Sequence, residues 1–368
     1  MSERIRVAVV FGGRSSEHAI SCVSAGSVLR ALDRERYDVV PIGVTPDGRW
    51  VLESDDSDRL TITDGKLPEV DAGGTSIVLA ADPTRPDLEV HEANQVPESL
   101  GTVDVVFPVL HGPFGEDGTI QGLLEMAGVP YVGSGVLASA VAMDKGAMKT
   151  VFAQAGLDQA PYVVVTDRDW RRRRDDVLAS VAALGLPVFV KPARAGSSLG
   201  ITKVKTADDV AAAIEDARRH DPRVVVEASV ESAREIECGV LVDADGEPRA
   251  SVCAEIVVHG EHEFYDFEAK YLDDAADLVV PADLDPAVSD RVRELAVLAF
   301  DALGCEGLAR CDFFVTADGG VLINEVNTMP GFTSISMFPR VWAESGVDYP
   351  ALVDRLVADA LRRGTGLR

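Results

Sequence analysis

Residues 310–327 have the sequence RCDFFVTADGGVLINEVN, the most informative local pattern of the chain. Apolar and polar residues alternate on both sides of Asp318-Gly319, which predicts two half-buried β-strands joined by a two-residue hairpin turn. The apolar face of this hairpin includes Cys311, Phe313 and Val315.

Four polar side chains project from the other face: Arg310, Asp312, Glu325 and Asn327. With the predicted turn, Asp312 lies opposite Glu325, and Arg310 lies opposite Asn327. Two opposed carboxylates repel each other unless a cation lies between them. Three oxygen ligands beside an arginine therefore predict a Mg²⁺ site, because Mg²⁺ binds carboxylates together with substrate phosphates. A charged strand pair facing solvent is the alternative interpretation.

The loop that follows, residues 327–336, has the sequence NTMPGFTSIS. Gly331 allows a tight approach of the backbone to a ligand. The hydroxyl groups and amides of such a loop can bind a carboxylate or an oxyanion. The loop is therefore a candidate substrate-binding segment beside the predicted metal site.

The first part of the chain alternates short β-branched runs with helical patterns. The predicted strands cover residues 7–11, 39–44 and 103–110, and the predicted helices cover residues 17–32 and 120–127. That alternation predicts an open, largely parallel α/β sheet. Residues 53–100 are rich in Asp, Pro, Gly and Thr and predict only irregular strands and loops.

We predict three domains, covering residues 1–138, 139–229 and 230–368. In the second and third, helices are expected at 144–156, 172–184 and 286–303, and strands at 162–165, 188–191, 224–227, 236–242, 250–256, 308–316 and 321–326. A hairpin turn at Asp245-Gly246 indicates antiparallel strands. The long stretch 259–276 is predicted to be a lid, since loops of that length in compact domains are commonly functional.

Lys191 ends a predicted strand and precedes a loop of small residues, KPARAGSSLG at 191–200. The backbone amides of small residues can approach phosphate closely. The loop is not a Walker A motif, because its lysine precedes the glycines. A plain β-turn would explain the Gly and Ser residues but not the lysine.

Two further candidates lie at strand ends in the N-terminal region. Glu17 belongs to GGRSSEH, residues 12–18, and His111 begins HGPFGEDG, residues 111–118. Open α/β sheets bind ligands at the carboxyl ends of their strands. The alternatives are a carboxylate placed by the helix dipole for Glu17 and a structural role for His111.

Charge and cysteine content limit the possible partners and compartments. Lys and Arg number 35 against 61 Asp and Glu, and the net charge of −26 opposes binding to nucleic acid or anionic membranes. Residues 171–174, four arginines flanked by Asp, predict a solvated helix face.

The first apolar run is too short for a signal sequence or a membrane span. Five scattered cysteines indicate neither a disulfide framework nor a zinc site, so we expect a cytoplasmic protein.

Seven segments resemble, in order, the motifs of the D-alanine-D-alanine ligase family of the ATP-grasp superfamily. They are GGRSSEHAIS, LHGPFGEDGTIQG, YVGSGVLASAVAMDK, FVKPARAGSSLG, DFEAKY, ARCDFF and NEVNTMPGFTSIS. The resemblance covers nearly the whole chain, and residues 53–100 and 168–184 match poorly. It implies an N-terminal open parallel α/β domain followed by a two-part ATP-grasp module with antiparallel sheets.

The resemblance also implies a role for each matching residue. Lys145, Lys191 and Lys270 would contact the ATP phosphates or adenine, and Glu227 and Glu235 would hold adenine and ribose. Asp312, Glu325 and Asn327 would bind two Mg²⁺ ions. Glu17, supported by Ser197 and Tyr271 and with His111 nearby, would take the ammonium group of the first D-alanine. Ser336 and the Gly331 amide would engage the second D-alanine and the oxyanion, and Arg310 would steady charge on the transferred phosphoryl group.

By this resemblance the chain would join two D-alanine molecules through an acyl phosphate, for peptidoglycan synthesis, as a homodimer. Mn²⁺ could replace Mg²⁺, and activation by a monovalent cation stays open. A D-alanine-D-lactate ligase is one alternative, although the resemblance associates Tyr271 with dipeptide formation. Another carboxylate-amine ligase of the superfamily, or a non-catalytic nucleotide-binding module, are further alternatives. The complete set of hairpin residues argues against a non-catalytic module.

Overall fold

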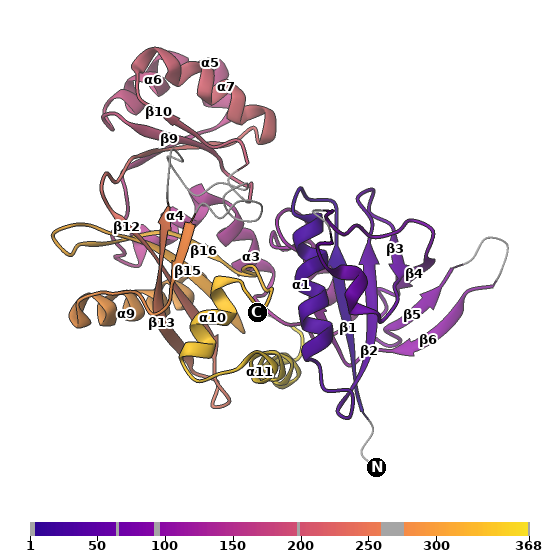
Figure 1. Ribbon diagram of the computed structural model, residues 1–368. Helices are drawn as coiled ribbons and strands as arrows, with labels where there is room; N and C mark the ends of the chain where they lie inside the picture. Colours follow the sequence, from indigo (N-terminus) through magenta and orange to yellow (C-terminus); the bar gives the residue numbers. More distant parts are fainter. Residues whose placement is uncertain (1–3, 64–65, 92–95, 197–198, 259–275, 367–368) are drawn as a thin grey trace.

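The protein is described here from a computed structural model, which covers residues 4–63, 66–91, 96–196, 199–258 and 276–366. Its strands form three sheets, which we name the N-terminal, small and C-terminal sheets (Figure 1). Within these ranges, no helix is both long and apolar enough to cross a bilayer. The predicted domain boundaries stay a prediction.

The N-terminal sheet has seven strands in the order β6-β5-β4-β3-β2-β1-β7. Its elements are β1 (Ile5–Gly12), α1 (His18–Ala31), β2 (Tyr37–Val44), β3 (Trp50–Leu52), η1 (Ser57–Leu60), β4 (Thr75–Leu79), β5 (Asp87–Val90), β6 (Glu98–Thr102), β7 (Val105–Pro108) and α2 (Thr119–Ala127). The α/β fold class is confirmed, but the sheet is mixed rather than largely parallel. Among the described strands of this sheet only β2, β1 and β7 pair in parallel, and the segment expected to be irregular adds antiparallel strands. These added strands are short and carry polar or glycine residues, so they lack a clear alternating pattern.

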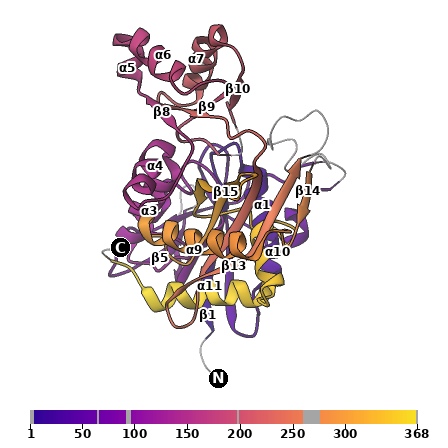
Figure 2. The same cartoon turned by 90° about the vertical axis from the view of Figure 1, so that its left-hand side faces the viewer.

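The small sheet, β10-β9-β11-β8, is antiparallel and lies at one end of the molecule with three helices (Figure 2). This region and the helices leading to it comprise α3 (Val136–Met143), α4 (Lys145–Gln154), β8 (Tyr162–Val165), α5 (Asp167–Arg172), α6 (Arg174–Ala182), β9 (Val188–Pro192), β10 (Thr202–Val204), η2 (Ala207–Asp209), α7 (Val210–His220) and β11 (Val224–Ala228). The helix predicted at 172–184 is confirmed as the somewhat shorter α6, whereas α5 was not predicted. Arg173, which leaves helical geometry, separates the two helices. The solvated arginine face is confirmed, since Arg171 and Arg173 pair with aspartates one turn away on the surface.

The C-terminal sheet is an antiparallel array in the order β14-β13-β12-β15-β16. Its elements are β12 (Arg234–Val242), β13 (Pro248–Val258), β14 (Ala276–Val279), α9 (Pro286–Leu303), β15 (Leu308–Val315), β16 (Val321–Asn327), α10 (Met337–Glu344) and α11 (Tyr349–Arg363). The sequence bounds α9 clearly, with Asp285 accepting the N–H of Ala287 at its start and left-handed Gly304 at its end. Helices α9 and α10 belong to two different hydrophobic cores that share this sheet, so α9 covers one face and α10 covers part of the other.

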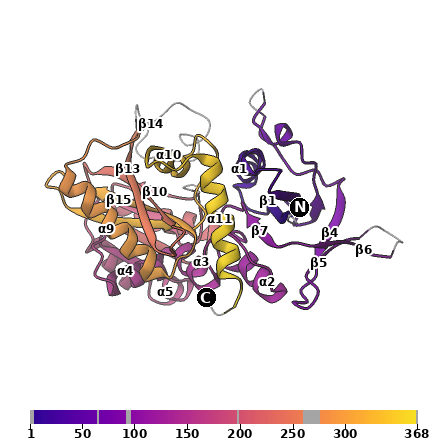
Figure 3. The ribbon, with the colours of Figure 1, turned by 90° about the horizontal axis from the view of Figure 1, so that it is seen from below.

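Helix α11 connects the C-terminal sheet with the N-terminal sheet, and seen from below it runs between the two halves (Figure 3). One continuous core includes residues of β1, β7, α1, α10 and α11. Phe332 lies at its centre, fully buried, with its ring 5.8 Å from that of Phe107. The two halves are therefore joined by apolar packing as well as by the chain itself.

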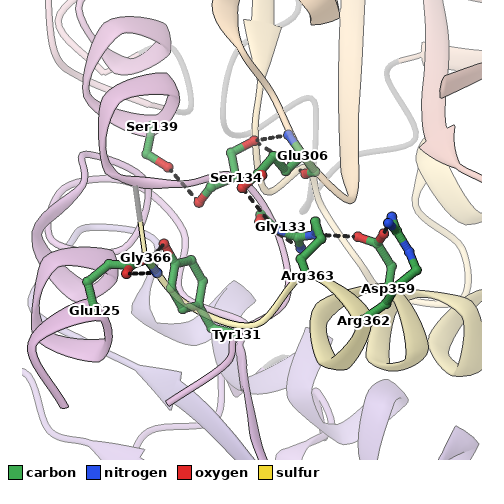
Figure 4. A network of polar contacts seen from close by, with 10 residues as sticks. All are labelled: Glu125, Tyr131, Gly133, Ser134, Ser139, Glu306, Asp359, Arg362, Arg363 and Gly366. Atoms are coloured by element: carbon green, nitrogen blue, oxygen red, sulfur yellow. Dashed lines mark hydrogen bonds and ion pairs between the residues drawn. The ribbon is translucent and has the colours of Figure 1, made fainter. Parts of the chain in front are cut away.

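A polar network at the end of α11 fixes the same junction (Figure 4). Arg363 donates to Asp359 at 2.7 Å, to Glu306 at 2.8 Å and to the Gly133 carbonyl at 3.3 Å. Ser134 contributes a hydroxyl that accepts the Glu306 N–H at 3.1 Å. One largely buried guanidinium thus ties three chain segments together.

We expect Arg363→Met to lower the free energy of unfolding by about 3 kcal/mol, because it leaves the buried Asp359 carboxylate without its enclosed partner. Arg362→Met is the matched control, since Arg362 also pairs with Asp359 but is about half exposed and should cost less than about 1 kcal/mol. Urea denaturation of both variants measures the difference. Equal losses would contradict a special role for Arg363.

Candidate active site

The hairpin of β15 and β16 places the four predicted polar residues together. Asp312 pairs with Glu325, and Arg310 pairs with Asn327. Paired residues of an antiparallel ladder point to the same face. The predicted juxtaposition of two carboxylates is therefore confirmed.

The turn that produces this pairing differs from the predicted one. Val315 pairs with Val321, so the connection is longer than two residues. Continued without a break, that register would bring Asn324 opposite Asp312. A β-bulge between Asp312 and Phe313 adds one residue to β16 and brings Glu325 into place instead. The predicted pairing of Asp312 with Glu325 is therefore correct, but the two-residue turn from which it was predicted is wrong.

Arg310 forms the centre of the polar face. Its Nε and Nη2 atoms each donate to the Asp312 carboxylate at 2.7 Å, and Nε also lies 3.2 Å from Glu237 Oε1. Asn327 donates through Nδ2 to Asp312 at 3.0 Å. Burial alone would lower the pKa of Arg310, but Asp312 and Glu237 outweigh it and raise that pKa well above its usual value. The guanidinium is therefore charged and held in a fixed orientation.

Glu237 is a member of this cluster that sequence reasoning missed. It lies on β12 directly opposite Asp312, which pairs with Glu325 on its other side. Three carboxylates thus lie in a row on adjacent strands. Nothing local in the sequence signals this, because β12 and β15 pair across about seventy residues of chain.

The donor set fits a magnesium ion. Asp312, Glu325 and Asn327 offer the hard oxygen atoms that Mg²⁺ requires. Among the described residues, no three His, Cys, Asp or Glu side chains by themselves form a metal site. The protein would therefore supply only part of the coordination shell, as Mg²⁺ sites completed by water and substrate phosphates do.

A second charged cluster lies on α4, β9 and β11. Lys191 Nζ donates to Glu227 Oε2 at 2.6 Å, and Lys149 Nζ lies 3.0 Å from Glu227 Oε1. Burial favours the neutral carboxyl, but the two lysines outweigh it and lower the pKa of Glu227 to about 2. Lys149 was missed by the sequence reasoning, although it follows Lys145 by one helical turn, a spacing that could have signalled it.

Both clusters open onto one cavity of about 290 Å³ between the small and C-terminal sheets. The predicted residues that line it are Lys145, Lys191, Glu227, Glu235, Arg310, Asp312 and Glu325. Lys145 connects the hairpin with the loop after β9, with its Nζ 3.6 Å from Glu325 and 3.1 Å from the Ala195 carbonyl. The tertiary structure therefore assembles residues from 145 to 325 around one polar space.

Glu17 lies at the start of α1 and is largely buried. A Cβ atom on Gly112 would lie 2.5 Å from its carboxylate, and one on Gly196 would lie 2.3 Å from it. Both positions must therefore be glycine if the carboxylate is to occupy this place. Three of the four Gly-containing loops singled out in the sequence, 12–18, 111–118 and 191–200, therefore meet at Glu17.

His111 and the loop 327–336 lie beside this carboxylate. His111 Nδ1 is 3.0 Å from the Met329 carbonyl, and burial lowers its pKa. Ser336 accepts the Thr333 N–H at 3.1 Å. Burial raises the pKa of Glu116 to about 8, and Glu17 and Arg310 also act on it in opposite directions, so these groups share one electrostatic environment.

Three predicted site residues lie outside the described residues: Ser197, Lys270 and Tyr271. The same holds for nearly all of the predicted lid, 259–276. Their roles stay predictions.

Comparisons with known proteins agree along the whole chain. Residues 6–134 match the family model described as D-ala D-ala ligase N-terminus, and residues 151–358 match the one described as D-ala D-ala ligase C-terminus. The D-alanine-D-alanine ligase of Streptomyces griseus subsp. griseus is 59% identical over 99% of this chain and 94% of its own length. That of Mycolicibacterium vanbaalenii is 58% identical over all of both chains.

Solved structures show the same likeness at lower identity. The VanG D-Ala:D-Ser ligase from Enterococcus faecalis superposes with a TM-score of 0.83 at 33% identity, covering 97% of this chain and 100% of that one. The D-alanine-D-alanine ligase from Coxiella burnetii gives a TM-score of 0.80 at 33% identity, covering 98% and 95%.

We expect Lys149→Met to lower the free energy of unfolding at pH 7 by about 2 kcal/mol, because Glu227 loses one of two enclosed cations. The pKa of Glu227 is depressed in the folded state, so its stabilisation is present above about pH 4.5 and is lost as the pH falls toward 2. The difference between variant and wild type should therefore shrink on acidification below pH 4.5. Lys203→Met, which removes a lysine paired with the exposed Glu231, is the control and should change stability by less than about 1 kcal/mol. A pH-independent difference in urea denaturation would contradict this account.

Proposed function

Because the chain belongs to the D-alanine-D-alanine ligase family, it is a ligase that forms D-alanyl-D-alanine for cell-wall synthesis, and we propose that the site described above performs this reaction with ATP through an acyl phosphate. A carboxylate is a poor electrophile, so its activation by phosphoryl transfer must precede attack by an amine. Such transfer depends mainly on positioning and on charge stabilisation. The observation that carries the proposal is the single cavity onto which the cations and the acidic hairpin open.

ATP would lie in this cavity between the small and C-terminal sheets. Lys145 and Lys191 would contact its phosphates, together with Lys270 from outside the described residues. Glu235 would hold the ribose. Glu227 was expected to contact adenine, and its carboxylate is held between two lysines, so we propose that it also orients Lys191.

Asp312, Glu325 and Asn327 would hold Mg²⁺, which when bound neutralises charge on the transferred phosphate. Arg310 lies on the same strand face, two residues before Asp312. Its planar fork of donors can follow charge as it spreads over phosphoryl oxygens. These residues would therefore act together at the γ-phosphate.

The two amino acids would bind on the side of Arg310 that faces away from ATP. Glu17 would take the ammonium group of the first D-alanine, with Ser197 and Tyr271 in support. Ser336 would bind the second D-alanine, and the Gly331 amide would face the oxyanion of the tetrahedral intermediate. The amine of the second D-alanine attacks the acyl phosphate, the new amide bond forms, and phosphate leaves. The stretch 259–276 would exclude water from this intermediate.

We further propose a cytoplasmic homodimer. All five cysteines are free and buried, which suits a reducing compartment. Exposed apolar side chains on neighbouring segments, Phe114, Met126 and Leu137, support a protein interface near α2 and α3. Sedimentation velocity measures the oligomeric state.

The decisive experiment measures phosphate release from ATP with and without D-alanine, together with the product formed. We expect D-alanine to be required and D-alanyl-D-alanine to appear in equal amount. D-lactate and D-serine, each offered with D-alanine as the second substrate, test the depsipeptide alternative and the D-Ala:D-Ser specificity of the similar VanG ligase. Phosphate release at the same rate with and without D-alanine would contradict the proposal.

Glu325→Gln should lower ATP turnover by a factor on the order of 10², because metal ligation contributes several kcal/mol to phosphoryl transfer. The fold should persist, since the volume of the side chain is unchanged. Glu294→Gln removes an exposed carboxylate of α9 that pairs with Arg291 away from the cavity, and it should stay close to wild type. Unimpaired turnover of Glu325→Gln at saturating Mg²⁺ would exclude the metal role.

Arg310→Met should lower kcat by about 10²- to 10³-fold while the KM for ATP changes much less. The reason is that a preorganised donor aimed at developing charge acts in the transition state more than in the ground state. Arg310→Lys, which keeps the charge but not the fork, should recover only part of the loss. If Arg310→Met keeps its kcat and only raises KM, Arg310 is a ground-state binding residue.

A further inference from the structure

Three polar side chains of the N-terminal region contact the main chain of the loop that carries Gly331. They are Ser24 on α1 and His111 and Glu116 in the segment between β7 and α2. Glu116 Oε1 accepts the N–H of Met329 at 3.1 Å, and its Oε2 accepts the N–H of Gly112 at 2.7 Å. One carboxylate therefore binds two loops that belong to different halves of the molecule.

His111 and Ser24 complete this set by an ordered chain of hydrogen bonds. A carbonyl can only accept, so His111 Nδ1 donates to the Met329 oxygen at 3.0 Å. The neutral imidazole then accepts at Nε2 from Ser24 Oγ, 3.1 Å away. Ser24 Oγ in turn accepts the N–H of Phe332 at 3.4 Å. A neutral His111 thus gives every member of the chain a suitable partner.

These contacts bracket Gly331 on both sides. The N–H and the C=O of Met329 and the N–H of Phe332 are all bound by side chains that lie 213, 218 and 308 residues away in sequence. Tyr349 also donates to the Phe332 carbonyl at 2.6 Å. The conformation at Gly331 is therefore set chiefly from outside its own loop.

The second oxygen of Glu116, Oε2, binds a residue that lies next to Glu17. Gly112, whose N–H binds Glu116, lies so close to the Glu17 carboxylate that a Cβ would approach it to 2.5 Å. Glu116 thus connects the Gly112 segment beside Glu17 with the loop that carries Gly331. The length of the Glu116 side chain therefore limits the distance between these two segments.

We infer that Glu116 is a positioning residue that, with His111 and Ser24, sets the distance between the two amino-acid subsites. This inference rests on the proposed function, which places the first amino acid at Glu17 and the second at the loop 327–336. The two oxygens of Glu116 accept the N–H groups of Met329 and Gly112, so we assign it no contact with substrate. It acts by holding the Gly331 amide and the adjacent loop where the second amine can reach the acyl phosphate.

The consequence is specific to the second half of the reaction. The acyl phosphate would form from ATP and the first D-alanine, and none of the residues proposed for that step lies in the segment 329–332. If that loop is displaced, the second amine is misplaced and the acyl phosphate reacts with another nucleophile. Water then releases the carboxylate and phosphate, and added hydroxylamine forms a hydroxamate and phosphate. Phosphate release would exceed dipeptide formation.

The experiment compares wild type with Glu116→Gln, which keeps one acceptor, and Glu116→Met, which keeps none. Phosphate and D-alanyl-D-alanine are measured in the same reaction with ATP, D-alanine and hydroxylamine. We expect the ratio of dipeptide to phosphate to fall about tenfold for Glu116→Met and less for Glu116→Gln, since small misplacements of reacting groups have effects of this size or larger. The ratio does not depend on the folded fraction, so loss of stability does not mimic the result.

Glu125→Gln is the matched control. Glu125 lies on α2 and also joins two regions of the chain, accepting from Tyr131 at 2.8 Å and from the Gly366 N–H at 2.8 Å, away from the site (Figure 4). Its ratio should equal that of wild type. If the Glu116 variants lose both products in equal proportion, or if Glu125→Gln shifts the ratio as much, Glu116 has only a structural role. A wild-type protein that forms no dipeptide would instead reject the proposed function.

Discussion

Three carboxylates lie side by side on β12, β15 and β16, and the balance of charge around them is the constraint on which the site depends. Neighbouring positions on paired strands are about 5 Å apart, so ionised groups there repel one another. Arg310 contacts two of the three, and Lys145 pairs with the third. The balance exists only when the strands are in this register and α4 lies beside them. The geometry that permits folding is therefore also the geometry that concentrates charge at the phosphate end of the cavity.

The same principle operates in the rest of the cavity. Glu227 is buried between Lys149 and Lys191, and its low pKa shows that the cations outweigh the cost of burial. A protein with a net charge of −26 would repel a polyanionic nucleotide over most of its surface. Lysines and an arginine, each held in place by a carboxylate, present fixed cationic groups to this cavity. Such preorganisation is what charge stabilisation in catalysis requires.

The amino-acid end depends on contact between the two halves of the molecule. Phe332 packs in the core shared with β7, while the neighbouring main chain is bound by Glu116, His111 and Ser24. Apolar packing brings the loop to the N-terminal sheet, and directional hydrogen bonds then select its conformation. Glu17 is enclosed in the same region by two glycines. A rigid junction, supported at its base by Arg363, is therefore part of the site.

Local periodicity was enough to predict the α/β class, the antiparallel strands, most of the longer helices and strands, and the four polar residues of the hairpin, although the turn assumed for that hairpin was wrong. The short strands between residues 50 and 102 were predicted only as irregular strands and loops without bounds or partners, since pairing partners rather than intrinsic pattern stabilise them. Only the tertiary structure showed the bulge at Asp312 and the places of Glu237, Lys149, Ser24 and Glu116. Each of these acts through a partner on a distant segment, and charge or hydrogen-bonding capacity in a sequence does not specify which distant group will satisfy it.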